Sequence, residues 1–140
     1  AYDYFIYNEK NIKNYMVVTF DLNNLKMCND NYGHSSGDAY IIHSAHIIET
    51  TFDRFGKCYR IGGDEFCCLI PDAAEFQIER FIQKMQQDIA ILNNKNIIPT
   101  EVGIACGYAL ATPDDADIEK VRERADEMMY HNKKVLKGLI

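Results

Sequence analysis

Hydrophobic and polar positions recur along this chain with two different periods. In several segments apolar side chains return every three or four residues, which is typical of helices with one buried face. Short runs of β-branched and aromatic residues stand between these segments and are typical of strands. The pattern predicts helices over residues 3–14, 25–32, 35–52 and 73–93, a last helix that opens at 112–114, and strands over 16–20, 57–61, 65–70 and 100–109.

The same spacing predicts which side of each longer helix is buried, because positions three and four apart share a face. Between residues 35 and 52 the predicted apolar stripe is Ala39, Ile42, Ala45 and Ile48. The helix over 73–93 carries its apolar positions at Ile78, Phe81, Ile82, Met85, Ile89 and Leu92. The predicted core positions of the last helix are Ile118, Val121, Ala125, Met128 and Met129.

Residues that interrupt regular structure mark the boundaries of these elements. The Asn23–Asn24 pair offers side chains that can cap the helix over 25–32, and Gly33 follows the end of that helix. The Gly62–Gly63 pair joins two predicted strands. Such a pair predicts a tight hairpin turn with positive φ angles, which glycine adopts without steric cost.

The order of elements is α, β, α, α, β, β, α, β, α, which places a hairpin between two helix-covered halves. We therefore predict an α+β fold with a ferredoxin-like, palm-type central sheet. The strand over 65–70 is apolar on both faces, so helices are expected on both sides of the sheet. A chain of 140 residues fits one domain over 1–140.

Composition and charge narrow the classes of function. The formal net charge of −6 argues against a nucleic-acid partner, which would require a basic face. The longest uncharged apolar stretch, 102–111, is far shorter than the roughly 18 residues that a membrane helix needs. The five cysteines form no CxxC pair, which favours reduced thiols over a zinc site.

Three acidic residues stand where predicted strands end or turn. Asp21 follows the first strand, and Asp64 and Glu65 lie at the tip of the hairpin. Adjacent central strands would bring the three carboxylates together, and such a cluster suits Mg²⁺ or Mn²⁺ bound together with substrate phosphates. The alternative is that Asp21 caps the next helix while the other two acids lie on an exposed turn.

Phosphates would need a binding site other than a P-loop, because no such motif is present. The turn over 23–26 presents backbone N–H groups at a helix start, where anions bind favourably. Lys133 and Lys137 lie one helical turn apart and offer a second anion site. Solvated lysines at a helix C-terminus are the alternative interpretation.

A base-recognition pair is the last candidate. Asn29 and Asp38 flank the loop over 33–37, and an amide with a carboxylate can together recognise the edge of guanine. The carboxylate would accept from the ring N–H and the amino group, a donor pair that adenine lacks. Taken singly, both residues are also ordinary helix caps.

Taken together, these motifs resemble the GGDEF family, the diguanylate cyclases. The signature itself is present as Gly62-Gly63-Asp64-Glu65-Phe66, and the other motifs stand at the spacing of that family. They are Asp21-Leu22-Asn23-Asn24-Leu25-Lys26, Asn29-Asp30, Gly33-His34, Gly37-Asp38, and Ala125-Asp126 with Tyr130 and Lys133. The resemblance covers nearly all 140 residues and is highly specific.

The resemblance implies a role for each matching residue. The implied metal ligands are the Asp21 and Asp64 side chains and the Leu22 carbonyl, with Mg²⁺ or Mn²⁺ as cofactor. Asp64 and Glu65 are the implied catalytic acids, and Gly62 and Gly63 form the turn. The implied substrate-binding residues are Lys26, Asn29, His34, Asp38, Lys133 and Lys137.

It also implies a fold similar to nucleotidyl cyclase catalytic domains and a reaction that joins two GTP molecules into cyclic di-GMP and two pyrophosphates. Catalysis would need a homodimer in which two sites face each other. The resemblance further implies a cytoplasmic domain that lacks its extreme N-terminal segment. A sensory or regulatory domain would be attached to it, in a parent protein that a membrane anchor could hold. A catalytically silent GTP-binding module is the alternative function.

Two departures from the family pattern change the expectations. Lys137 stands where an arginine is usual, which keeps the charge and loses bidentate phosphate binding. The product-inhibition motif RxxD would place Arg at 53 and Asp at 56, whereas this chain has Asp53 and Gly56. We therefore predict no tight inhibition by cyclic di-GMP at that surface.

Overall fold

The structure is a computed structural model that describes residues 14–115, 117–136 and 138. Its strands are β1 (Met16–Leu22), β2 (Lys57–Arg60), β3 (Glu65–Ile70) and β4 (Ile104–Leu110). Its helices are α2 (Leu25–Tyr32), α3 (His34–Phe52), α4 (Ile78–Asn94) and α5 (Ile118–Leu136). The predicted helix over 3–14 lies, except for Asn14, outside the described residues.

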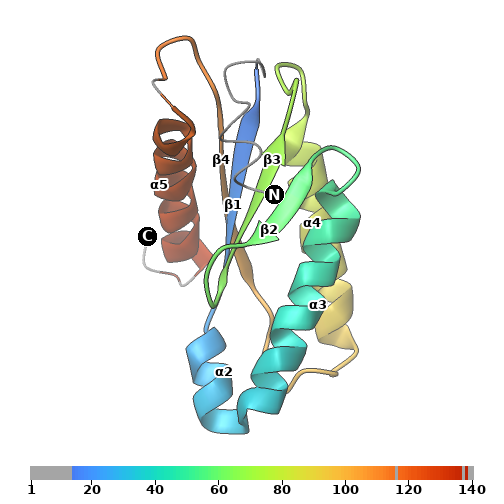
Figure 1. Ribbon diagram of the computed structural model, residues 1–140. Coiled ribbons are helices and arrows are strands. Elements are labelled where there is room, and N and C mark those ends of the chain that lie inside the picture. The colour runs from blue at the N-terminus through green and yellow to red at the C-terminus, as the bar shows by residue number, and fades with distance from the viewer. Residues whose placement is uncertain (1–13, 116, 137, 139–140) are drawn as a thin grey trace.

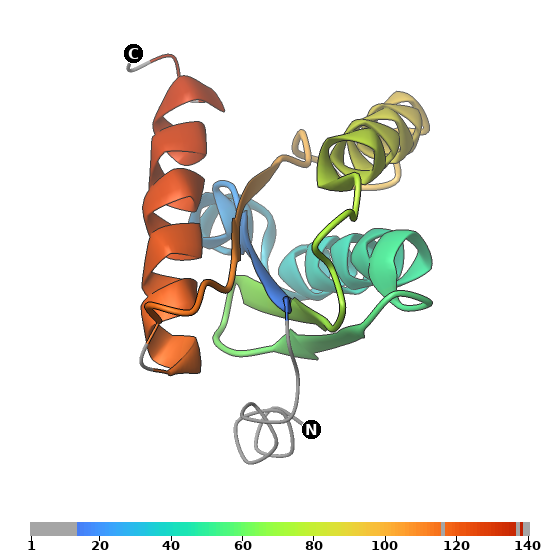
Figure 2. The same ribbon diagram turned by 90° about the horizontal axis from the view of Figure 1, so that it is seen from above.

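The four strands form an antiparallel sheet in the order β2-β3-β1-β4 (Figure 1). Seen from above, α5 covers one face of the sheet, and α3 and α4 lie on the other (Figure 2). This arrangement confirms the predicted palm-type α+β fold with helices on both sides. Among the described helices, none combines the length and apolar character that a bilayer span requires.

Alternation along β1 and β3 divides the core into two parts, because successive side chains of a strand point to opposite faces. Val18, Phe20 and Cys68 belong to the larger cluster, which α3 and α4 cover. Val17 and Cys67 belong to the smaller cluster, which contains residues of α5. The strand over 65–70 is therefore buried on both faces, as its sequence predicted.

The boundaries of several elements differ from the predicted ones: β1 extends to Leu22 rather than 20 and so includes Asp21, and α4, β4 and α5 begin later than predicted. Helix α4 begins at Ile78 rather than 73, because the Ala73 N–H donates to the Asn14 carbonyl at 2.6 Å and ties this segment to the chain before β1. The residues after it turn so that Phe76 stacks on Phe81. Strand β4 begins at Ile104 rather than 100, and α5 begins at Ile118, after the turn at 112–114.

Two predictions about turn chemistry are wrong. Asn24 precedes α2 in the left-handed conformation, at φ 59°, and its side chain makes no cap bond. Neither glycine of the Gly62–Gly63 pair adopts a positive φ in the left-handed region. The hairpin is wider than a two-residue turn: the Ile61 N–H donates to the Glu65 carbonyl at 2.9 Å, and the Arg60 guanidinium donates to the carbonyls of both glycines.

The buried faces of two helices also differ from the predicted stripes. Ile42 is 65% exposed, and Tyr40 is buried in its place. The buried face of helix α3 therefore contains polar atoms, and one of them has a local partner: the Thr51 hydroxyl donates to the Ile47 carbonyl at 2.7 Å. Met128 of α5 is 38% exposed, beside the Tyr108 N–H that donates to its sulfur. Apolar spacing alone did not reveal either rotation.

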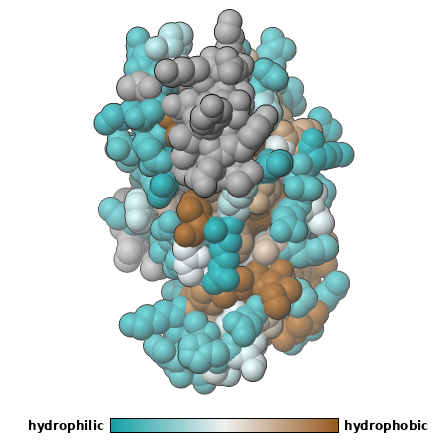
Figure 3. All heavy atoms as spheres, viewed as in Figure 1, coloured by the Kyte–Doolittle hydropathy of each residue, from teal (hydrophilic) through white to brown (hydrophobic). Residues whose placement is uncertain are grey.

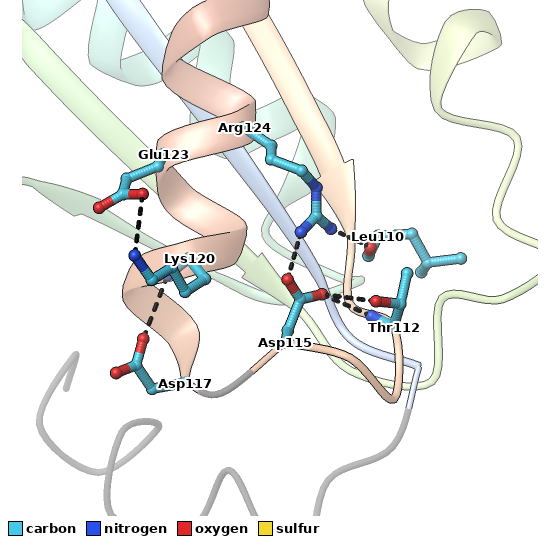
Figure 4. Close-up of polar contacts among 7 residues, drawn as sticks. All are labelled: Leu110, Thr112, Asp115, Asp117, Lys120, Glu123 and Arg124. Carbon is cyan, nitrogen blue, oxygen red and sulfur yellow. Dashed lines mark hydrogen bonds and ion pairs between the residues drawn. The ribbon is translucent and has the colours of Figure 1, made fainter.

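The connection from β4 to α5 is held by one carboxylate. Asp115 accepts hydrogen bonds from the Thr112 N–H and hydroxyl and an ion-paired bond from the Arg124 guanidinium (Figure 4). Arg124 also donates to the Leu110 carbonyl at 2.7 Å. These bonds connect the first turns of α5 to the end of β4. The guanidinium lowers the pKa of Asp115, and the bonds from Thr112 act in the same direction.

Replacing Asp115 with alanine should lower the free energy of unfolding by about 1–2 kcal/mol at pH 7, because three hydrogen bonds are lost at a partly exposed site. Denaturant unfolding measures this difference. A group with a depressed folded-state pKa stabilises above its unfolded pKa, so the cost should vanish as the pH falls through the folded-state value. The exposed neighbour Asp114 provides the control, Asp114→Ala. A cost for Asp115→Ala that is unchanged at acidic pH would contradict the ion pair.

Candidate metal and nucleotide site

Three carboxylates converge where β1 ends and the hairpin turns. Asp21 of β1 is paired directly with Glu65 of β3. The Leu22 N–H donates to the Asp64 carbonyl at 2.9 Å, so the Asp21–Glu65 pair is of the non-hydrogen-bonded kind, in which side chains stand closest. Carboxylate oxygens of Asp21, Asp64 and Glu65 all lie within 4.8 Å of one another. The predicted cluster is therefore present.

Positive charge near this cluster comes from α5. The Lys133 ammonium donates to Asp21 Oδ2 at 2.9 Å. The other oxygen, Asp21 Oδ1, is buried and has no hydrogen-bond partner, and the residue is only 4% exposed. Burial raises the pKa of Asp21, the bond from Lys133 lowers it, and the charge of Asp64 raises it again, with a net upward shift. One ammonium does not offset these acids.

The pKa of Glu65 is raised by the same causes as that of Asp21. Burial raises its pKa first, and the negative charges of Asp21, Asp126 and Asp64 raise it further. Arg122 opposes these effects from α5, where its guanidinium lies 3.8 Å from Asp126. The site thus holds more negative charge than its own cations balance.

This arrangement fits a divalent cation. Mg²⁺ and Mn²⁺ prefer carboxylate, carbonyl and water oxygens, and the cluster supplies carboxylates in a small space. A buried carboxylate oxygen without a partner is costly unless a ligand completes it, which is the state of Asp21 Oδ1. The Lys133 ammonium stands beside the other oxygen, where it supplies part of the charge that a cation would bring.

The backbone beside the cluster is held by Tyr40, a residue that the sequence analysis missed. Its buried hydroxyl donates to the Asn23 carbonyl at 2.6 Å and accepts from the Gly103 N–H at 3.0 Å. The Asn23 N–H in turn donates to the Gly103 carbonyl at 2.8 Å. Burial raises the pKa of Tyr40 to about 12, so the hydroxyl stays neutral. The position of Leu22 and of the turn after it therefore depends on α3.

A second residue that the sequence did not reveal, Asn132, fixes the position of α5 along strand β4. Its side-chain oxygen accepts from the Cys106 N–H of β4 at 3.0 Å. Asn132 directly precedes Lys133. Because the bond fixes the position of α5 along β4, it also fixes where the Lys133 ammonium lies relative to Asp21. No sequence signal distinguished Asn132 from an ordinary surface asparagine, whereas a tyrosine inside the helix over 35–52 could have been recognised as a buried polar anchor.

The predicted base-recognition residues lie on neighbouring helices. The Asn29 side chain of α2 lies against Gly37 of α3, since a Cβ built there would be 1.6 Å from Asn29 Oδ1. Asp38 is the next residue and is exposed. The structure thus brings Asn29 to the residue before Asp38, while His34 opens α3 after Gly33, which has a φ of 90°.

The remaining predicted residues are placed less closely. Lys26 is exposed in the first turn of α2, after the loop that follows Asp21. Lys137 lies outside the described residues, so its pairing with Lys133 stays a prediction. At the predicted product-inhibition surface, a Cβ on Gly56 would lie 2.0 Å from the Leu69 carbonyl. An aspartate would not fit there without a backbone shift, and the absence of tight inhibition by cyclic di-GMP at this surface stays a prediction.

Removing the Lys133 charge should change cation binding by the protein alone. In Lys133→Met, Asp21 loses its ion-pair partner, so the free energy of unfolding should fall by about 1–3 kcal/mol at neutral pH. A raised folded-state pKa makes the ionised form the destabilising one, so this cost should shrink as the pH falls. Mg²⁺ without nucleotide should then stabilise the variant more than the parent, because no ammonium competes for Asp21.

Thermal unfolding with and without Mg²⁺ measures this difference. Lys134→Met is the matched control, because Lys134 is the exposed neighbour on the same turn of α5. Equal stabilisation of Lys133→Met and the parent by Mg²⁺ would show that the ammonium and the cation do not share Asp21.

Comparison with known proteins agrees with the geometry. The sequence family described as "Diguanylate cyclase, GGDEF domain" matches residues 6–137. Diguanylate cyclase DgcN of Escherichia coli K12 is 31% identical over 119 residues, which cover 84% of this chain and 29% of that protein. Diguanylate cyclase DgcP of the same organism is 28% identical over 120 residues, which cover 85% of this chain and 35% of that protein.

Solved structures show the same fold. The GGDEF domain of DgcB from Caulobacter crescentus, in complex with c-di-GMP, gives a TM-score of 0.81 at 22% identity and covers 96% of this chain and 83% of that one. The active GGEEF domain of a diguanylate cyclase from Vibrio cholerae gives a TM-score of 0.74 at 20% identity, covering 91% and 81%. The chain spans about a third of the length of the two Escherichia coli relatives. Its sequence match and its fold together show that this chain belongs to the GGDEF domain family.

Proposed function

We propose that this domain is a diguanylate cyclase, which condenses two GTP molecules into cyclic di-GMP with release of two pyrophosphates. One observation carries the proposal: the Asp21, Asp64 and Glu65 carboxylates converge, and Asp21 brings to them a buried oxygen that has no hydrogen-bond partner. In a GGDEF domain this is the place for a divalent cation that binds together with a nucleotide triphosphate.

The cation would be held by the Asp21 and Asp64 carboxylates and the Leu22 carbonyl. When bound, it supplies positive charge at the phosphates and lowers the pKa of the attacking hydroxyl. Lys133 would leave Asp21 and pair with the phosphates, with Lys26 and Lys137 as further cations there. The ammonium thus has a partner in both states, and Asp21 exchanges one cation for another.

In the reaction, the 3′-oxygen of one GTP forms a bond to the α-phosphorus of another, and the bond to the β-phosphate bridging oxygen breaks. Pyrophosphate leaves, and the hydroxyl proton passes to Asp64, with Glu65 completing the acidic site. A second attack in the opposite direction closes the ring. Each chain carries one such site, so two copies must face each other, and a regulatory domain attached to the chain could control their meeting.

The guanine base would be recognised between α2 and α3 by Asn29 and Asp38, with His34 in the same loop. The exposed carboxylate of Asp38 is free to accept from the two N–H donors of the guanine edge, and Asn29 supplies an amide beside it. Such recognition would select GTP over ATP.

Asp38→Ala should therefore weaken GTP binding about 5- to 150-fold, because lost hydrogen bonds to two donors cost about 1–3 kcal/mol. The variant should also lose discrimination between GTP and inosine triphosphate, which lacks the amino group. Calorimetric titration measures both affinities. Glu49→Ala, at an exposed acid near the other end of α3, should leave them unchanged. Parent-like selectivity in Asp38→Ala would disprove the assignment of the base site.

Mass spectrometry of the products after incubation with GTP and Mg²⁺ tests the proposed function directly. The expected product is cyclic di-GMP, with pyrophosphate released in equal amount to the GTP consumed. GTP binding without turnover at any protein concentration would favour the silent GTP-binding module. Absence of GTP binding with Mg²⁺ present would exclude both functions for this domain.

A further inference from the structure

Two cysteines face each other across the hairpin that carries the acidic turn. Cys58 of β2 is paired with Cys68 of β3. The bond from the Ile61 N–H to the Glu65 carbonyl marks a hydrogen-bonded pair, and the two kinds of pair alternate along an antiparallel ladder. Cys58 lies three positions before Ile61, an odd number of steps along the ladder. Cys58 and Cys68 therefore form a non-hydrogen-bonded pair, in which Cα atoms are about 4.5 Å apart. Disulfides span Cα separations of about 4.4 to about 6.8 Å, so this pair lies within range.

Access to the pair is one-sided. Cys68 is fully buried in the larger core cluster, whereas Cys58 is half-buried and packs against that cluster. Cys58 lines an open hollow of about 200 Å³ between α3 and β2, together with Ile41 and Ala45. The surface over α3 is visibly apolar in this region (Figure 3). A small uncharged oxidant can therefore reach Cys58 and not Cys68.

The chemistry of the Cys68 thiol also makes it a poor first target. A hydrogen bond with the Cys58 thiol raises the pKa of Cys68, and burial raises it further. Because the thiolate is the reactive form, Cys68 is the poorer first target of an oxidant. Its sulfur nevertheless lies beside that of Cys58, where it can react with an oxidised Cys58.

The other cysteines are placed apart from this pair. Cys67 adjoins Cys68 in sequence and points to the opposite face of the sheet, into the cluster beneath α5. Cys28 belongs to α2 and Cys106 to β4, and both are buried. All five thiols are free in the structure.

We propose that Cys58 and Cys68 form a reversible cross-strand disulfide when the domain meets a hydroperoxide such as hydrogen peroxide. Cys58 sulfur attacks one peroxide oxygen, the O–O bond breaks, and Cys58 sulfenic acid and water result. Cys68 sulfur then attacks the sulfenic sulfur, the S–O bond breaks, and the thiol proton leaves with the hydroxide as a second water. The two thiols are oxidised by two electrons, and the peroxide is reduced to water.

The disulfide would tie the two strands of the hairpin together four residues before Gly62 and four residues after Asp64. The connection between the strands, residues 61–64, would then be closed by a covalent bond as well as by the bonds from Arg60 and Ile61. Formation of this bond requires neither GTP nor a cation, so the proposal stands apart from the proposed cyclase activity.

Thiol counting and mass spectrometry test the proposal. After treatment of the folded protein with hydrogen peroxide, the thiols titrated under denaturing conditions should fall from five to three. The intact mass should fall by two hydrogen atoms, peptide mapping should find 58 linked to 68, and dithiothreitol should restore all thiols. Amide exchange at 61–64 should become slower in the oxidised form. Five remaining thiols, a link that involves another cysteine, or unchanged exchange would overturn the proposal.

Single variants separate the two steps. Cys68→Ala should form no internal link and should accumulate a sulfenic acid on Cys58, which a cyclic 1,3-dione traps. Cys58→Ser should show neither the link nor the adduct. The matched control is Cys67→Ala, at the buried neighbour on the opposite face, and it should still form the 58–68 link. Loss of the link in Cys67→Ala, or its survival in Cys68→Ala, would show that the pairing is wrong.

Discussion

Asp64→Asn should lower cyclic di-GMP formation on the order of 100-fold or more, because charge stabilisation worth several kcal/mol depends on the bound cation. The amide keeps the shape of the side chain but loses an anionic ligand and a proton acceptor. It also removes one of the charges that raise the pKa of Asp21, so the fold should not be weakened. Product formation is measured by mass spectrometry, and stability by denaturant unfolding.

Metal dependence separates loss of the cation from loss of the fold. In the parent, GTP and Mg²⁺ should bind cooperatively, because without the cation the carboxylates repel the triphosphate. A chelator should therefore weaken GTP binding strongly in the parent and only weakly in Asp64→Asn.

Asp72→Asn is the matched control for this charge change. Asp72 is exposed, lies away from the site in the turn after β3, and has a φ of 50°, which asparagine also tolerates. It should leave product formation, metal dependence and stability as in the parent. If the parent binds GTP equally well with and without Mg²⁺, the metal-bridged site is wrong, and so is the reaction proposed for it.

Gly107→Ala should lower the free energy of unfolding by about 3 kcal/mol, at the upper end of what overpacking costs. A Cβ at this position of β4 would lie 2.1 Å from the Ala125 carbonyl oxygen and 2.3 Å from the Met129 nitrogen. Both atoms belong to the backbone of α5, so a side-chain rotation cannot relieve the clash. The helix must move away from the sheet, and Lys133 should move with it.

Denaturant unfolding measures the cost, and the response to Mg²⁺ reports the displacement of Lys133 from Asp21. Gly63→Ala is the control for stability: a Cβ there meets nothing within 4 Å, and its backbone conformation does not require glycine. An unfolding midpoint for Gly107→Ala like that of the parent would mean that α5 does not approach β4 so closely.

Local sequence patterns predicted most of the elements, because helix and strand periodicity are properties of short segments. The helix over 25–32 has the predicted bounds, and the strand over 65–70 does as well. The two-sided apolar character of that strand correctly implied helices on both faces of the sheet. Once β1 and β3 were expected to be neighbours, the convergence of Asp21, Asp64 and Glu65 followed from their positions at the strand ends.

Turn and face details were predicted less well, because they depend on contacts with distant parts of the chain. The Gly62–Gly63 pair would permit a tight turn, but the Arg60 guanidinium holds a wider one. The apolar spacing around Ile42 suggested burial of that side chain. Tyr40 is buried instead, because its hydroxyl finds partners at Asn23 and Gly103.

The sequence by itself determined the family, the order of the elements and which acids meet, since these follow from motifs and periodicity along the chain. Only the tertiary structure decided the electrostatic state of the site. The contact between Lys133 and Asp21 joins residues at opposite ends of the chain and exists because α5 lies against β4 at Gly107 and is held there by Asn132. Such a contact depends on the packing of a helix on a sheet, which no local pattern of side chains encodes.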